Sequence, residues 1–213
     1  MNSSGNSTQL KPTARRIVEQ AARLFADQGY DLISMRDIAK ACDIKAPSLY
    51  HHFSDKQSLY QAVLQAVFAQ QNAEIAEVFV TQMAAEEKLH QVILLSARKI
   101  SSDHVFRQLL WRELLQNDPE RMQFLAEEVM AQSCLQLQEI LQQIQPNSLQ
   151  TDSHFAITSV MGLLLFHFQL GAMRQYLPGA QALHQDVDYL AEQIFHMIKS
   201  GVVYAPPQRI NDK

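Results

Sequence analysis

The sequence is poor in residues that interrupt helices, with only 6 glycines and 7 prolines among 213 residues. It has just two cysteines, Cys42 and Cys134, which lie too far apart for the paired spacing of a metal site or a redox motif. We interpret both as reduced thiols buried in helices, which excludes a disulfide-stabilised secreted fold. No run of about eighteen apolar residues is free of polar breaks, and the polar N-terminal segment lacks the apolar centre of a signal peptide. These absences predict a cytoplasmic, helix-rich protein without a membrane span.

A large excess of charge of either sign is also missing, because the formal net charge is −4. The two parts of the chain differ, however. Residues 1–60 hold 8 lysines and arginines against 6 acidic residues, whereas residues 61–213 hold 10 against 16. Overall acidity does not exclude DNA binding where the cations face one way, but so small a positive excess is weak support. The case for DNA binding therefore depends on geometry.

Apolar residues recur at helical spacing along almost the whole chain, and no stretch shows the alternation typical of strands. We predict an all-α protein whose first three helices form a helix-turn-helix DNA-binding domain over residues 13–60. A second helical domain should occupy residues 61–203, between a disordered arm at 1–12 and a loose tail at 204–213. The predicted helices are Ala14–Gln28, two short helices within Ser34–His52, Asp55–Met83, Glu86–Ile100, Asp103–Gln116, Asp118–Gln145, Asp152–Tyr176 and Leu183–Lys199.

The most specific pattern of the sequence begins at Ser34, which can cap the first short helix. Asp37, three residues further on, completes a capping box. Asp43 follows in the turn, which requires a left-handed backbone conformation. Asp tolerates this conformation better than most residues. We predict a second capping box, formed by Ser54 and Gln57, at the start of the long helix that connects the two domains.

The second short helix has an inner and an outer face. Leu49 and Phe53 are four residues apart and should point into the domain. The outer positions carry small, hydroxyl, aromatic and imidazole side chains, which suits a helix that enters the major groove of DNA. Lys56 lies in the first turn of the next helix and should grip a phosphate, since a helix N-terminus attracts anions. The residues predicted to contact DNA are Ser34, Arg36, Lys45, Ala46, Pro47, Ser48, Tyr50, His51, His52 and Lys56.

The run IKAPSLYHHFSDKQSLY, with SMRDIAKAC ahead of it and ARRIVEQAARLFADQGYDLIS further upstream, resembles the DNA-binding domain of the tetracycline-repressor (TetR) family of bacterial regulators. The resemblance covers residues 13–60 well and the remainder only by layout. Asp43 stands where the family usually has glycine, and Lys45 where it usually has a capping serine or threonine. Losing that hydroxyl typically costs ~1 kcal/mol, and neither departure breaks the fold. The resemblance implies a homodimer, without a cofactor, that binds a double-stranded DNA operator and is released by a small-molecule effector.

An aromatic cluster around Trp111, the only tryptophan, indicates a candidate ligand pocket. Side chains of this kind at helical spacing are more often plain core, so that interpretation competes with the pocket. Arg107, Arg112 and Glu113 lie beside the cluster and would orient the polar end of a largely apolar ligand. The resemblance implies an effector site in this variable region, although no motif matches individual residues. The residues predicted to bind the ligand are Phe106, Arg107, Leu110, Trp111, Arg112 and Phe124.

The predicted helix Asp152–Tyr176 is apolar nearly all round in its middle, so it must be covered on more than one side. A monomer would leave much of it exposed, and large exposed apolar patches are rare on monomers. We predict dimerisation through this helix and Leu183–Lys199, packed against their partners as four helices. The predicted interface residues are Val160, Gly162, Leu163, Phe166, Leu190 and Ile194, with Gly162 at a close contact.

These patterns favour a ligand-responsive repressor without catalytic residues. An activator or dual regulator of the same family is the alternative within this class. A helical-bundle metalloenzyme would need two Glu-x-x-His motifs on separate helices, and we find only Glu87–His90, since Glu192–His196 has the wrong spacing. A helical protein-interaction module without affinity for DNA is a third possibility.

Overall fold

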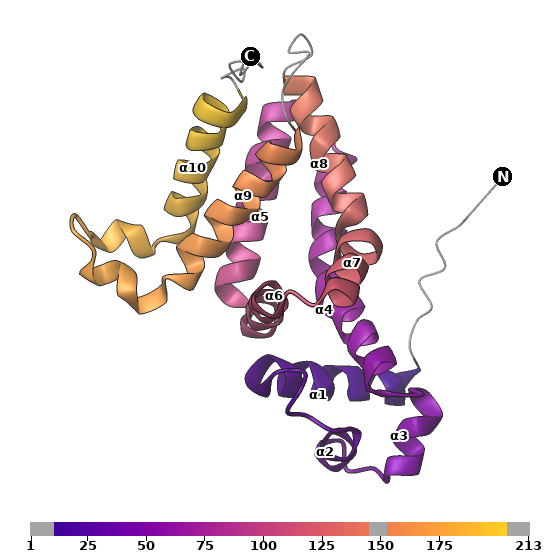
Figure 1. Ribbon diagram of the computed structural model, residues 1–213. Helices are drawn as coiled ribbons and strands as arrows, with labels where there is room; N and C mark the ends of the chain where they lie inside the picture. The colour runs from indigo at the N-terminus through magenta and orange to yellow at the C-terminus, as the bar shows by residue number, and fades with distance from the viewer. Residues whose placement is uncertain (1–10, 145–152, 204–213) are drawn as a thin grey trace, which may run out of the picture.

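The computed structural model describes residues 11–144 and 153–203, and every regular element in these two ranges is helical (Figure 1). The all-α prediction is therefore confirmed. Within these ranges, no helix combines the length and the apolar character needed to cross a membrane. Most of the predicted arm at 1–12 and all of the tail at 204–213 lie outside the described residues. The α-helices are α1 Pro12–Gln28, α2 Met35–Ala41, α3 Ala46–His52, α4 Lys56–Phe79, α5 Ala85–Ser102, α6 His104–Gln116, α7 Pro119–Phe124, α8 Ala131–Ile144, α9 Ser153–Gln169 and α10 Val187–Met197.

Helices α1, α2 and α3 form a small domain at one end of the molecule, below the longer helices in Figure 1. The inner stripe of α1, which includes Ile17, Ala21 and Phe25, is buried completely. It packs against α2 and against the start of α4. Gly29 ends α1 with a φ of 91°, a backbone conformation that residues with a side chain rarely adopt. This layer holds the helix-turn-helix on the outer surface of the molecule.

Helix α4 connects this domain to the rest of the chain, as predicted, but it ends at Phe79. Leu59 and Val63, near its start, are buried against the first domain, whereas Ile75 near its end is buried among the later helices. Its capping box differs from the prediction by one residue. The carboxylate of Asp55 accepts a hydrogen bond of 2.7 Å from the backbone N–H of Ser58, because a carboxylate is a stronger acceptor than the hydroxyl of a preceding serine.

The predicted helix Asp118–Gln145 forms one rod with an irregular middle. Asp118 caps it and Pro119 occupies its first turn, as the sequence indicated. A π-helical segment, η1 Leu125–Met130, separates α7 from α8. Such π-turns leave some carbonyls without their usual helical donor, and the side-chain amide of Asn72 donates a hydrogen bond of 2.8 Å to the carbonyl of Val129.

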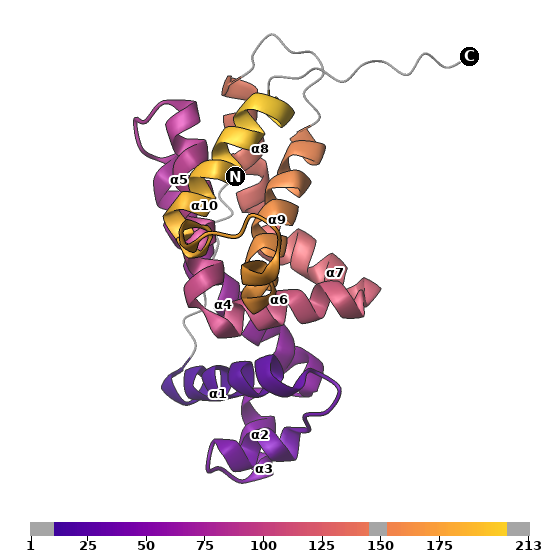
Figure 2. The same cartoon turned by 90° about the vertical axis from the view of Figure 1, so that its left-hand side faces the viewer.

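The last two predicted helices are shorter than expected. Helix α9 ends at Gln169, because Gly171 adopts a φ of 48° and the chain continues as a 3₁₀-helix, η2 Gly171–Tyr176. Gly171 therefore makes a turn and does not serve the close helix contact expected of an apolar helix. A second 3₁₀-helix, η3 Ala182–Gln185, precedes α10, and the π-helical η4 Ile198–Val203 follows it. Helices α9 and α10 lie toward the viewer in Figure 2, and α5 and α8 pack against their inner sides.

Candidate nucleic-acid interface and ligand cavity

The turn between α2 and α3 has the geometry that its sequence predicted. The backbone N–H of Asp37 donates to the hydroxyl of Ser34 at 3.3 Å, and the carboxylate of Asp37 accepts from the N–H of Ser34 at 2.9 Å. This reciprocal pair confirms the capping box. Asp43 adopts a φ of 51°, and the N–H of Ile44 donates to the carbonyl of Ala39 at 3.0 Å, which closes the turn. Local side chains thus set the angle between the two short helices.

Helix α3 presents its outer face to solvent. Leu49 and Phe53 are buried, as predicted, and they anchor the helix to its domain. Lys45 takes the N-cap position, where its ammonium cannot accept a hydrogen bond from the helix N–H groups as a serine hydroxyl would, and its side chain is exposed. The exposed residues on this face and on the neighbouring start of α2 are Ser34, Arg36, Lys45, Pro47, Ser48, Tyr50 and His51, and Ala46 and His52 are half-buried.

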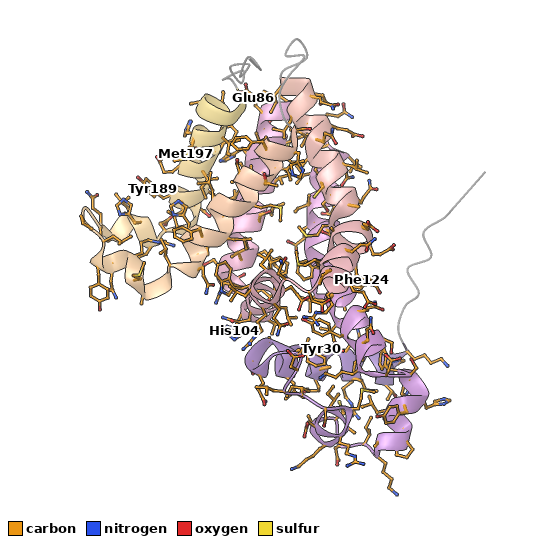
Figure 3. The ribbon with its side chains drawn as sticks, viewed as in Figure 1. Tyr30, Glu86, His104, Phe124, Tyr189 and Met197 are labelled. Carbon is orange, nitrogen blue, oxygen red and sulfur yellow. The ribbon has the colours of Figure 1, made fainter. Side chains whose placement is uncertain are left out.

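Lys56 points elsewhere. Its ammonium lies 4.2 Å from the centroid of the Tyr30 ring and 3.5 Å from the carbonyl oxygen of Asp31. Burial lowers the pKa of Lys56, and the carboxylate of Asp55 already caps the helix start. Tyr30 itself lies where the first domain meets the helices above it (Figure 3). A phosphate contact by Lys56 stays a prediction, and it would require the ammonium to leave the Tyr30 ring.

Residues 17–63, which contain this helix-turn-helix, match the sequence model of the bacterial regulatory proteins of the tetR family. This part of the chain is a TetR-type DNA-binding domain. It is 40% identical over 57 residues to the HTH-type transcriptional regulator UidR of Escherichia coli (strain K12), which corresponds to 27% of this chain and 29% of UidR. It is 42% identical over 53 residues to IcaR of Staphylococcus aureus (strain Newman), a negative transcriptional regulator of the biofilm operon icaADBC, covering 25% of this chain and 28% of IcaR. The chain thus matches less than a third of the length of these curated relatives.

Solved structures extend the similarity of fold to most of the chain. FadR from Bacillus halodurans, a fatty acid degradation regulator, has a TM-score of 0.73 over 91% of this chain and 98% of its own, with 20% sequence identity. AibR, solved in complex with isovaleryl coenzyme A and operator DNA, has a TM-score of 0.68 over 87% of this chain and 97% of its own, also with 20% identity. At this level of identity the likeness concerns the fold alone.

Arg112 joins the helix-turn-helix domain to the helices above it. Its guanidinium donates to the carbonyls of Ala26 and Asp27, at 2.9 and 2.7 Å, and so satisfies the last turn of α1 from helix α6. A Cβ atom on Gly29 would come within 3.0 Å of this guanidinium. The side chain of Arg112 is thus engaged at this junction, and its predicted role in ligand binding stays a prediction.

A buried ionic network lies at the same junction. The side chain of Glu113 is fully buried and accepts a hydrogen bond of 2.6 Å from the hydroxyl of Tyr60 and one of 3.0 Å from Nε of Arg121. Burial, together with the bond to Glu113, raises the pKa of Tyr60. Burial alone would lower the pKa of Arg121, but its bond to Glu113 and the charge of that carboxylate raise it. The guanidinium also lies 4.9 Å from the centroid of the Tyr30 ring. Glu113 therefore binds α4 and α7 together and does not face a ligand.

The interior cavity lies between α4, α5, α6, α8 and α9, and its volume is about 110 Å³. Its walls are almost entirely apolar, with Asn72, Ser96, Ser133 and Cys134 as the exceptions. The hydroxyl of Ser133 donates to the amide oxygen of Asn72 at 3.1 Å, so these polar groups are paired within the wall. The lining residues are Phe68, Asn72, Ile75, Val92, Ser96, Ile100, Phe106, Leu110, Met130, Ser133, Cys134, Leu137, Ile157, Val160, Met161, Leu164 and Leu165.

Most of the predicted ligand residues do not line the cavity. Phe106 and Leu110 line it, as expected. Trp111 and Phe124 do not, and both are half-buried on other faces of their helices. Arg107 is also excluded, because it donates to the carbonyls at the end of α5. The lining residues that were not predicted lie on α4, α5, η1, α8 and α9. None of these helices carried a sequence signal that distinguished a cavity wall from ordinary core.

A surface groove adjoins the cavity between α7, η1, α8 and α9. Its volume is about 520 Å³. Five residues line both spaces, which makes them neighbours across one thin wall. Burial raises the pKa of one of these residues, Cys134, so its thiol stays protonated and the expectation of an inert cysteine stands. The shared residues are Leu110, Met130, Cys134, Ile157 and Met161.

The predicted dimer residues divide into two sets. Val160, Leu190 and Ile194 are buried within the single chain, and their place in an interface stays a prediction. Gly162 and Phe166 face outward from α9, and a Cβ on Gly162 would meet no atom within 4 Å. Leu163 is half-buried. The outward face of α9, η2, η3 and α10 carries the exposed apolar residues Phe155, Phe166, Met173, Tyr176, Leu177, Leu183 and Met197.

His90 has a structural partner. Its Nε2 lies 2.7 Å from one carboxylate oxygen of Glu192. The other oxygen of that carboxylate lies 2.9 Å from Nε2 of His196. These contacts join α5 to α10. Within residues 11–144 and 153–203, no three histidine, cysteine or carboxylate side chains come together in a way that could hold a metal ion.

Proposed function

We propose that this protein is a cytoplasmic transcriptional repressor that binds an inverted-repeat DNA operator as a homodimer and releases it when a small, largely apolar molecule binds. The observation that carries the proposal is the capped helix-turn-helix, whose helix α3 is anchored by Leu49 and exposes Lys45, Ser48 and Tyr50. A cation, a hydroxyl and an aromatic hydroxyl on one outer face suit contacts with phosphates and base edges. IcaR, which resembles the same domain, is a negative regulator.

The dimer is supported by the outward apolar face of α9 and α10. Phe166 is 61% exposed and Met197 55% exposed, on two neighbouring helices that lie toward the viewer in Figure 2. A two-fold dimer presents one α3 helix per protomer, and its half-sites should lie about one helical turn of DNA or a multiple apart, ~34–36 Å centre to centre. The operator should therefore have inverted symmetry.

Release by a ligand requires that the ligand favour a conformation in which the two α3 helices no longer fit the operator. The cavity and the junction share helix α6, since Phe106 and Leu110 line the cavity while Arg112 and Glu113 bind α1 and α4. A shift of α6 on ligand binding would therefore move the DNA-binding domain. A coupling of ~1–3 kcal/mol suffices for a 5–150-fold loss of DNA affinity.

Selection of bound fragments from random DNA by the purified protein tests the function directly. We expect recovered sites with inverted symmetry, and recovery of asymmetric sites alone would contradict the dimeric repressor. An absence of any selected sequence would favour a helical interaction module.

Ser48→Ala and Tyr50→Phe should each weaken binding to the selected operator, and at least one should lose discrimination at one base position by roughly 1–3 kcal/mol. Each change removes a hydroxyl from the exposed face of α3 without altering the buried side of the helix. Ser102→Ala is the matched control, because Ser102 is exposed on α5 far from this face and bonds only its own helix. Mobility shifts on point variants of the operator measure the affinity of all three variants. Equal affinities of the three variants would exclude α3 as the helix that contacts the bases.

A further inference from the structure

We propose that the ligand of this cavity carries no anionic group: it has an uncharged apolar body and a neutral or cationic end. This inference rests on the proposed function and specifies its effector. The cavity of about 110 Å³ is of the size that takes a single ring or a short alkyl chain. The rest of the molecule would lie in the adjoining groove of about 520 Å³.

The walls of the cavity set the first condition. Within residues 11–144 and 153–203, no lysine, arginine, aspartate or glutamate lines it. An ion placed there would lose its hydration without gaining a partner, which is strongly unfavourable. Its few polar groups are already engaged, because Asn72 bonds both the carbonyl of Val129 and the hydroxyl of Ser133. The part of the ligand inside the cavity must therefore be uncharged.

The groove sets the second condition. Among the residues that the structure describes, its lining contains no lysine or arginine either, and His154 is the one titratable base found there. From Met122 to Met173, the stretch that supplies most of the groove, the sequence has no lysine or arginine at all. The same stretch has several carboxylates, and Glu127 and Glu128 are exposed on the π-helical segment that borders the groove. The potential at the mouth is therefore negative, which repels an anion and attracts a cation.

Arginines on the adjoining helices do not change this conclusion. Arg107 is bound to carbonyls at the end of α5, and Arg112 to carbonyls at the end of α1. Arg121 is paired with the buried carboxylate of Glu113. Each of these cations is held by partners outside the groove. The expected selectivity thus differs from that of AibR, which has been solved with isovaleryl coenzyme A, a ligand with several phosphate charges.

Three probes of the same chain length compare a neutral, a cationic and an anionic head group: decan-1-ol, decyltrimethylammonium and decanoate. Each is added below its micelle concentration to the full-length protein loaded with the neutral dye N-phenyl-1-naphthylamine, at pH 8 so that imidazole side chains are neutral. We expect the alcohol and the ammonium compound to displace the dye at concentrations at least about tenfold lower than decanoate. Equal or better displacement by decanoate overturns the inference, as does a lack of displacement by all three probes.

A pair of lysine variants places the effect in the groove. Gln138 lines it and is half-buried on α8, whereas Gln132 is exposed on the same helix outside it. Gln138→Lys should improve displacement by decanoate about tenfold and weaken that by the ammonium compound. Gln132→Lys makes the same change in net charge and should leave the order of the probes unaltered. Equal effects of the two variants would overturn the assignment to this groove.

The measurement uses no DNA, so its failure is distinguishable from failure of the proposed function. A protein that binds its operator but shows no preference among the probes remains a repressor with a different ligand class. A protein that shows the expected preference but binds no operator would instead contradict the repressor.

Discussion

Gly162→Leu is expected to convert the proposed dimer into a folded monomer. Within the protomer, a Cβ at this position meets no atom within 4 Å, so the leucine has room. Replacing glycine inside a helix also favours the helical state by roughly 0.5–1 kcal/mol. At a contact between two copies of α9, the added side chain overpacks the interface at a cost of typically 1–3 kcal/mol, and two-fold symmetry applies that cost twice. Light scattering at micromolar concentration should report a protomer mass for the variant and twice that mass for the wild type.

The same variant should lose at least about a hundredfold in affinity for a full operator, because each monomer engages only one half-site. Gly162→Ala is the matched control: it changes helix propensity but adds only one carbon, and it should keep the dimer. Urea unfolding should show the leucine monomer to be folded and cooperative. A Gly162→Leu protein that stays dimeric would place the interface on another face, and a wild type that is monomeric at this concentration would exclude the dimer.

Arg121→Met should have the largest effect on stability. Glu113 has no exposed side-chain surface, and Arg121 is its charged partner at 3.0 Å. Removing one member of a buried ion pair leaves an uncompensated charge and typically lowers the free energy of unfolding by 3–5 kcal/mol. Urea unfolding, followed by circular dichroism, measures this loss. The expected midpoint shift should be accompanied by weaker DNA binding, because the network holds α4 against α7 at the junction of the two domains.

Two further variants make this result specific. The triple replacement Tyr60→Phe, Glu113→Leu and Arg121→Met removes every member of the network and should recover most of the lost stability, since buried ion pairs can often be replaced by apolar groups. Arg98→Met breaks the ion pair with Asp188 on the surface, where both side chains are more than half exposed, and should change stability little. If Arg121→Met were no more damaging than Arg98→Met, the network would contribute nothing to the junction.

The short helices were predictable because their signals are local. Ser34 and Asp37 are three residues apart, and Asp43 has to satisfy only its own turn. The same holds for Asp118 before Pro119 at the start of α7. The one local error, Ser54 in place of Asp55, concerns two neighbouring acceptors that compete for the same helix start. Which of two neighbouring side chains caps the helix depends on which is the stronger hydrogen-bond acceptor.

The ligand and interface residues were harder to predict because rotation of a helix about its axis is not a local property. Helix α9 is apolar nearly all round, so its sequence cannot say that Val160 faces the interior while Phe166 faces outward. The neighbouring helices α5, α8 and α10 decide that rotation. Trp111 was predicted to line a pocket because of its size, yet Leu110 and not Trp111 lines the cavity from α6. Side-chain volume indicates burial, but it does not indicate which space a side chain fills.

By itself, the sequence determined the helical class, the helix-turn-helix with its caps and turn, and the resemblance of this domain to the TetR type. All of these depend on residues within a few positions of one another. Only the tertiary structure decided that Arg112 caps α1 across the domains, that Glu113 binds Tyr60 and Arg121, and that the cavity lies between α6, α8 and α9. Those contacts join residues far apart in the chain, and a charged or apolar residue acquires such a partner only when packing brings the two helices together.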